Sequence, residues 1–184
     1  TEKNDLNLAA YTGTAGGDVQ LSYAIADHIG LMFNGSFADR TSDSTDNYHK
    51  HAFFEGSAGY FSKVGNAGIA EIYGGYGFGT VDSYYDSPIF TNNTLANINR
   101  IFIQPGIGIG SDFFDGYFAT RLAMVNISQN NTSETGFFIE PVLTGKLGYK
   151  YVKFVSQIGL SVPIHSSEIE FEYQPFMISL GIQI

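Results

Sequence analysis

The chain has 184 residues and a formal charge of −9, from 18 acidic and 9 basic side chains, and it contains no cysteine. The acidic balance argues against a nucleic-acid-binding protein, which needs a basic surface, and the lack of cysteine excludes disulfides and thiolate metal sites. Charged residues make up 15% of the chain, below the roughly 25% of soluble domains. The length suits one domain, 1–184, and Thr1–Asp5 does not resemble a signal peptide, so we expect a mature form.

Apolar and polar residues alternate with a period of two along nearly the whole chain, which predicts β-strands. The predicted strands lie near 6–11, 19–25, 29–37, 51–62, 67–82, 97–110, 116–128, 137–148, 151–164 and 174–184. A short turn of helix is the one alternative, around Leu95–Ile98. The chain contains no linker that would divide it.

The connections between these strands alternate in length. Tight connections are predicted at 27–28, 63–66, 110–115 and 148–150, and long polar ones at 39–50, 83–96, 129–136 and 165–173. The first hairpin, at 14–17, is the exception, since it is short on the long-loop side. Sorted loops and an even strand number are typical of outer-membrane barrels. The predicted fold is therefore all-β: a closed, antiparallel, up-and-down transmembrane β-barrel of ten strands, or of eight if the first hairpin or 67–82 pairs differently.

The two faces of the strands differ in chemistry. One face is aliphatic, as at Phe154, Ile158, Phe176 and Ile178, and is predicted to face lipid. The other is mostly small and uncharged, whereas a soluble surface would be about 25–35% charged. Its few charged residues are predicted to form a polar network inside the lumen, with the pairing of acids and bases left open; they are Glu55, Glu71, Arg100, Arg121, Glu140, Lys146 and Lys153.

Aromatic residues collect near the predicted strand ends, which suggests two interfacial girdles. On the long-loop side they are Phe37, Phe53, Phe54, Tyr84, Tyr85, Phe137, Phe138, Phe171 and Tyr173. On the short-turn side they are Tyr60, Phe61, Phe113, Phe114, Tyr117, Tyr149 and Tyr151.

Three segments carry a resemblance to a known family: 18–37 (DVQLSYAIADHIGLMFNGSF), 70–79 (AEIYGGYGFG) and 99–115 (NRIFIQPGIGIGSDFFD). The chain resembles the small outer-membrane β-barrel proteins of Bacteroidota, which are often predicted to be lipoproteins. The resemblance implies a bacterial outer-membrane barrel without a catalytic signature. In a lipoprotein of this kind, a lipidated cysteine would precede Thr1.

Two groups of residues are candidates for chemistry. His49 and His51 stand near Asp43 and Asp46, which suggests a metal site or an Asp/His hydrolytic pair like that at the rim of the ten-stranded omptin proteases; a solvated loop base is the favoured interpretation. His165 and Ser167 resemble the His-x-Ser arrangement of lipid A deacylases, but ordinary polar residues at a strand exit are the favoured interpretation. No cofactor or metal is predicted.

The sequence therefore predicts a non-enzymatic outer-membrane barrel, structural or an accessory subunit of a larger outer-membrane assembly. We expect its long loops outside, its termini in the periplasm, and outer-membrane lipid and lipopolysaccharide as its surroundings. Its lumen is expected to be occluded, because ten strands enclose little more than their own side chains and bulky residues point inward; these are Tyr11, Met32, Tyr73, Phe102 and Tyr117. The alternatives are an outer-rim enzyme, lipid A-modifying or omptin-like, and a soluble ligand-binding barrel.

Overall fold

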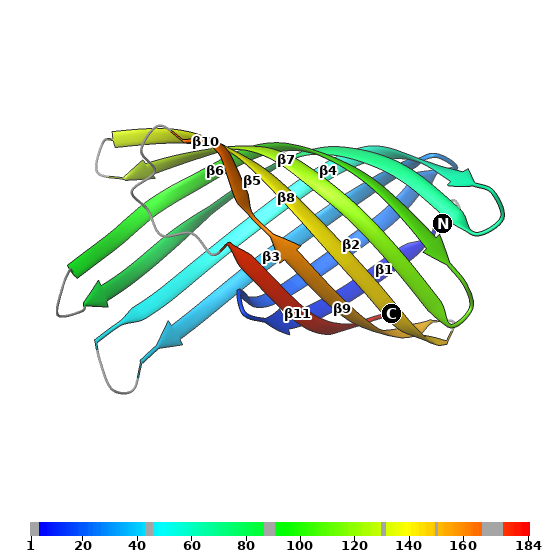
Figure 1. The fold of residues 1–184 in the computed structure, drawn as a ribbon, viewed down its shortest axis with the longest axis horizontal. Helices are drawn as coiled ribbons and strands as arrows, with labels where there is room; N and C mark the ends of the chain where they lie inside the picture. The colour runs from blue at the N-terminus through cyan, green and yellow to red at the C-terminus, as the bar shows by residue number, and fades with distance from the viewer. Residues whose placement is uncertain (1–3, 43–45, 87–90, 130–131, 150, 167–174) are drawn as a thin grey trace.

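The structure is a computed structural model that describes residues 4–42, 46–86, 91–129, 132–149, 151–166 and 175–184. These residues form a single antiparallel barrel of tilted strands (Figure 1). The strands are β1 (Leu6–Gly13), β2 (Gly16–Ala26), β3 (Ile29–Thr41), β4 (Tyr48–Val64), β5 (Gly68–Asp86), β6 (Thr91–Gly110), β7 (Phe114–Gln129), β8 (Thr132–Tyr149), β9 (Val152–Leu160), β10 (Val162–Ser166) and β11 (Phe176–Gln183).

The barrel closes through its last strands. Each strand from β1 to β8 pairs with the next along the chain, and β11 pairs with both β9 and β1. The two ends of the chain meet there, since the backbone N–H of Leu8 donates to the carbonyl of Ile184 at 2.9 Å. Both termini lie at the short-turn end of the barrel (Figure 1). The predicted closed antiparallel barrel is therefore confirmed.

The ninth predicted strand needs one correction. The sequence predicted a single strand over 151–164, but the structure divides it at Ser161 into β9 and β10, which both pair with β8. A register shift follows between Pro163 and His165, where a proline cannot donate a backbone hydrogen bond to a ladder. Ten strands thus close the barrel, and β10 continues β9 along β8.

Where the structure describes them, the predicted long loops at 39–50, 83–96 and 129–136 are mostly β-structure. Strands β3 and β4 pair as far as Thr41 and Tyr48, and β5 and β6 as far as Asp86 and Thr91. The helical turn considered at Leu95–Ile98 is wrong, because this segment pairs with β5. The prediction stopped early because these extensions carry polar residues on their outer face, which hides the apolar alternation. Long hairpins therefore project from one end of the barrel (Figure 1).

The outer surface is largely apolar along the strands. The side chains of Phe154, Ile158, Phe176 and Ile178 are 40–51% exposed, as predicted for the outward face. Four aromatic residues predicted for the girdles are wrongly placed, because Phe53, Phe61, Tyr117 and Phe138 point into the barrel by the alternation of their strands. Phe171 and Tyr173 lie outside the described residues. Among the described residues there is no helix with the length and apolar character needed to cross a membrane.

Candidate functional site: the polar lumen

A buried carboxylate lies at the centre of the lumen. Glu55 on β4 accepts from Arg100 on β6, with 2.5 Å between Oε1 and Nη2, and from Arg121 on β7, with 3.0 Å between Oε1 and Nη1. The side chain of Glu55 is only 6% exposed, and those of the arginines are 19% and 14% exposed. Such a charge is stable at this depth only because it is paired and hydrogen-bonded.

These contacts belong to a larger group that we call the lumen belt: Asn34, Glu55, Arg100, Gln104, Arg121 and Glu140. Asn34 on β3 donates to Glu55 at 3.3 Å, and Gln104 accepts from Arg121 at 2.8 Å. On the other side, Glu140 on β8 lies 3.4 Å from Nη1 of Arg100 and accepts from Ser161 at 3.3 Å. The belt connects β3 to β8 through the bore, and its two acids balance its two bases.

Aromatic rings support the arginines of the belt. The guanidinium carbon of Arg121 lies 4.1 Å from the ring centroid of Phe102, and that of Arg100 lies 5.0 Å from the ring of Phe53. Phe102 is 4% exposed. A guanidinium over an aromatic face is attracted by the ring quadrupole, so these rings stabilise the cations where water is scarce.

A second polar group, which we call the turn-side group, lies nearer the short turns: Glu71, Asp115, Tyr117, Lys146 and Lys153. Tyr117 donates to Glu71 at 2.5 Å, and Lys153 forms an ion pair with Asp115 at 2.7 Å. Lys146 is close enough to Glu71, Asp115 and Lys153 to interact with their charges. This group, like the belt, contains as many acids as bases.

All seven charged residues predicted for the lumen line its cavity, but they divide between these two groups. The structure brings together Glu55, Arg100, Arg121 and Glu140, and places Glu71, Lys146 and Lys153 in the turn-side group. Sequence reasoning missed Asp115, which it assigned to a connection. Its alternation with Tyr117 and Arg121, on the same face of one strand, was the signal that could have found it.

Glycine makes room for the aromatic rings of the lumen. A methyl group at Gly106 would overlap the hydroxyl of Tyr117, and one at Gly75 would overlap the ring of Phe102. Both glycines face inward, and each lies on the strand next to the one that carries the ring. The rings can therefore lie against bare backbone, which brings Tyr117 to Glu71 and Phe102 to the belt.

The space left inside the barrel is a cavity of about 1040 Å³. Its lining includes Asp18 and His51 at the long-hairpin end, the belt, and Lys63 and Asp115 at the turn end. Tyr11, Met32, Tyr73 and Tyr117 line it as well, as the sequence predicted, whereas the inward-pointing Phe102 is buried against the guanidinium groups of Arg100 and Arg121.

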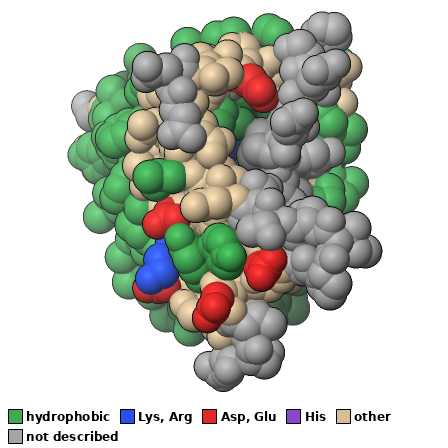
Figure 2. All heavy atoms as spheres, turned by 90° about the vertical axis from the view of Figure 1, so that its left-hand side faces the viewer, with side chains coloured by type: hydrophobic (Ala, Val, Ile, Leu, Met, Phe, Trp, Pro, Cys, Tyr) green, Lys and Arg blue, Asp and Glu red, His purple; other side chains and the backbone are tan. Residues whose placement is uncertain are grey.

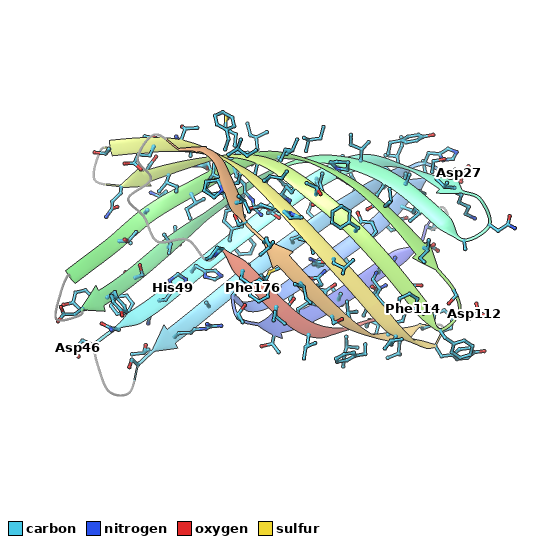
Figure 3. All side chains as sticks on the ribbon, in the orientation of Figure 1. Asp27, Asp46, His49, Asp112, Phe114 and Phe176 are labelled. Atoms are coloured by element: carbon cyan, nitrogen blue, oxygen red, sulfur yellow. The ribbon has the colours of Figure 1, made fainter. Side chains whose placement is uncertain are left out.

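The long-hairpin end of the cavity, which we call the mouth, carries a pair of histidines. Nε2 of His49 lies 3.1 Å from Nδ1 of His51, and Nε2 of His51 lies 3.0 Å from the hydroxyl of Ser36. His49 and Asp46 lie at this end, whereas Asp27 and Asp112 lie at the opposite end (Figure 3). Burial and the neighbouring His49 lower the pKa of the His51 imidazole, which favours its neutral form.

Several acidic side chains and a basic one lie at the mouth end of the barrel (Figure 2). Asp82 accepts a hydrogen bond from Tyr48 at 3.0 Å, which raises the pKa of that phenol, and Asp39 forms an exposed ion pair with Lys50 at 3.2 Å. Asp43, proposed with Asp46 as a partner of the histidines, lies outside the described residues. The mouth thus combines acids with two imidazoles.

The second catalytic candidate is only partly described. The backbone of His165 lies in β10, paired with Phe137 of β8, and Ser167 lies outside the described residues. The His-x-Ser hypothesis thus stays a prediction.

Comparison of the chain with protein-family models and with curated proteins gives no match.

Proposed function

We propose that the protein is an integral outer-membrane β-barrel of structural or accessory type, with a lumen closed by the belt. One observation carries the membrane part of this proposal: the apolar face of the strands switches from the outside to the inside of the barrel near the long-hairpin end. A change of sidedness within one strand requires a change of the surrounding solvent.

Strand β6 shows the switch. Toward the turn end, Ile101, Ile103 and Ile107 point outward and are 45–64% exposed, while Arg100 points into the lumen. Beyond Arg100 the order reverses: Asn97 and Asn99 point outward, while Ala96 is buried inside. Leu95, 65% exposed, is the exception on this strand.

Strands β7 and β8 switch at the same level. Outward Met124 pairs with Ile101 and with Phe137, and the next outward pair along these strands is Asn126 and Thr135. Buried apolar side chains form a cluster inside the barrel around this level: Ala96, Val125 and Ile127 lie beyond the Ile101–Met124 pair, and Phe102, Ala123 and Phe138 lie on its turn side. We call the part of the strands with outward apolar side chains the band, and the part beyond it toward the long hairpins, with outward polar side chains, the collar. A band in lipid and a collar in water explain both patterns, because apolar side chains turn toward lipid where it is present and toward each other where it is not.

The length of the band agrees with a bilayer. The outward apolar residues run over Ile29–Phe37 on β3, Ala52–Tyr60 on β4 and Ile101–Ile109 on β6. A tilted strand needs about 9–11 residues to cross the hydrocarbon core, and each segment is of that length. Backbone pairing around the closed barrel leaves no strand edge in lipid.

The belt supports a structural role rather than a diffusion pore. It places charge-balanced side chains across the bore, and two aromatic rings hold its arginines. In this arrangement the long hairpins are extracellular, where they meet lipopolysaccharide, and the termini are periplasmic. The resemblance to small outer-membrane barrels of Bacteroidota supports the same orientation. Purification from native membranes with partners retained tests whether the protein is an accessory subunit of a larger outer-membrane assembly.

Fluorescence tests the membrane proposal directly, because the chain contains no Trp. We would place single tryptophans at Ile103 in the band and at Asn97 in the collar, and fold each variant into vesicles whose phosphatidylcholine carries brominated acyl chains. The Ile103→Trp probe should be quenched by the lipid and protected from iodide, and the Asn97→Trp probe should behave oppositely. Equal iodide quenching of both probes in folded barrels would contradict the proposal.

A soluble ligand-binding barrel is the second candidate, and the cavity favours it. Its volume of about 1040 Å³ is at the upper end of the ~300–1,000 Å³ of small-molecule pockets. The same experiment separates the two functions, because a soluble barrel stays folded without detergent and leaves both probes open to iodide.

A further inference from the structure

We propose that the mouth of the barrel binds a divalent first-row transition-metal ion between His49 and His51. This goes beyond the membrane function proposed above and does not depend on it, because it uses only the inner wall of the mouth. The sequence alone favours a solvated role for these residues, but the distance between their nitrogens supports a metal site.

The two imidazoles come from alternate residues of one strand. Residues i and i+2 of a strand point to the same face, and on β4 this face is the inner one, shared with Glu55. Nε2 of His49 and Nδ1 of His51 are 3.1 Å apart, and the rings lie at 71° to each other. One proton bridges these nitrogens in the metal-free protein.

The distance between Nε2 of His49 and Nδ1 of His51 is also suitable for a metal ion that replaces the bridging proton. Metal–imidazole bonds of about 2.0–2.1 Å at angles of about 90–110° set two ligand nitrogens about 2.9–3.4 Å apart. The observed 3.1 Å lies in this range. Small rotations of the two rings would direct both lone pairs at one point, and water would complete the coordination.

Ser36 on β3 holds the second ligand in a suitable orientation. Its hydroxyl lies 3.0 Å from Nε2 of His51, so Nε2 is engaged and Nδ1 is the nitrogen that faces His49. A hydrogen bond to the remote nitrogen is how proteins orient metal-ligating histidines. The site is thus more ordered than two surface histidines.

The charges around the mouth favour a cation on balance. Asp18 on β2 is close enough to attract a cation at His51, whereas Arg40 on β3 opposes it. The guanidinium of Arg40 donates to the carbonyl of Gly13 at 2.9 Å. At the same end, Asp39 is balanced by its ion pair with Lys50, and Asp82 and Asp86 add negative charge that raises the local concentration of cations. Because no group of three or more acidic or histidine side chains in the described residues is placed to hold a metal, we expect a site of two protein ligands, accessible and exchangeable.

The experiment uses the untagged full chain in detergent micelles, titrated with Cu²⁺, the divalent ion that nitrogen sites bind most tightly. We expect one strong equivalent per barrel, with an electron paramagnetic resonance spectrum showing two nitrogen ligands. His49→Asn and His51→Asn should each weaken binding at least tenfold. His28→Asn is the matched control, since His28 lies at the turn end against the carbonyl of Phe61, and it should bind as the wild type does.

A measurement on the wild type needs no variant. Diethylpyrocarbonate modifies accessible imidazoles, so bound Cu²⁺ should protect His49 and His51, read by mass spectrometry, while the modification of His28 stays unchanged. Equal modification with and without Cu²⁺, a spectrum without two nitrogen ligands, or equal binding by the His49→Asn and His51→Asn variants would overturn the proposal.

Discussion

Glu55→Gln tests whether the belt stabilises the barrel. The substitution keeps the size and shape of the side chain but removes the negative charge that lies between Arg100 and Arg121. Two guanidinium groups would then share Glu140 alone, 3.4 Å from Arg100. Because Glu55 is only 6% exposed, water cannot replace the lost charge.

We expect a loss of roughly 3–5 kcal/mol in the free energy of unfolding, the usual cost of breaking a buried ion pair by removing one partner. This corresponds to a change between about a hundredfold and a few thousandfold in the folding equilibrium. Arg100→Ala and Arg121→Ala, which leave Glu55 short of a partner, should cost a similar amount. The assay is urea unfolding in detergent micelles, followed by circular dichroism.

Two comparisons make the result specific to the belt. Asp39→Asn removes the acid of an ion pair whose side chains are 71% and 48% exposed, and should change the free energy of unfolding by less than about 1 kcal/mol. Glu55→Gln combined with Arg121→Gln restores charge balance and should cost less than the two single changes added together. If Glu55→Gln unfolds within about 1 kcal/mol of the wild type, the reasoning about the belt is refuted.

Three further predictions concern the wall and the bore. Gly106→Ala should displace Tyr117 from Glu71 and lower the free energy of unfolding by about 1–3 kcal/mol in the same urea assay. Gly74 faces outward, and no atom lies nearer than 3.9 Å to a carbon added there, so Gly74→Ala should change the free energy of unfolding little. Equal effects of the two substitutions would contradict the close contact of Gly106 with Tyr117. Ile103→Arg should lower the free energy of unfolding in vesicles by about 2–4 kcal/mol, and Asn97→Arg should lower it much less. The reverse order would contradict the boundary between band and collar. Wild-type protein in planar bilayers should give no stable channel, whereas combined Ala substitutions of Glu55, Arg100 and Arg121 should admit ions; steady wild-type conductance would contradict occlusion.

The sequence by itself determined the class of fold and the face of most side chains. Strict alternation with a period of two assigns each residue to one side of its strand, so the inward position of Glu55, Arg100 and Arg121 could be predicted from neighbours alone. The same local rule puts His49 and His51 on one face. Both conclusions depend on backbone geometry that spans only two residues.

Other features required the tertiary structure. The ion pair of Glu55 with Arg121 joins residues 66 positions apart, and it depends on the register of every ladder between β4 and β7 and on how the barrel closes. The distance between the nitrogens of His49 and His51 likewise depends on Ser36 from the neighbouring strand. The register between neighbouring strands decides how the lumen divides into the belt and the turn-side group. It also decides that the apolar face switches at a common level on β6, β7 and β8. Alternation along one strand cannot specify these features, because it carries no information about the register of the neighbouring strand.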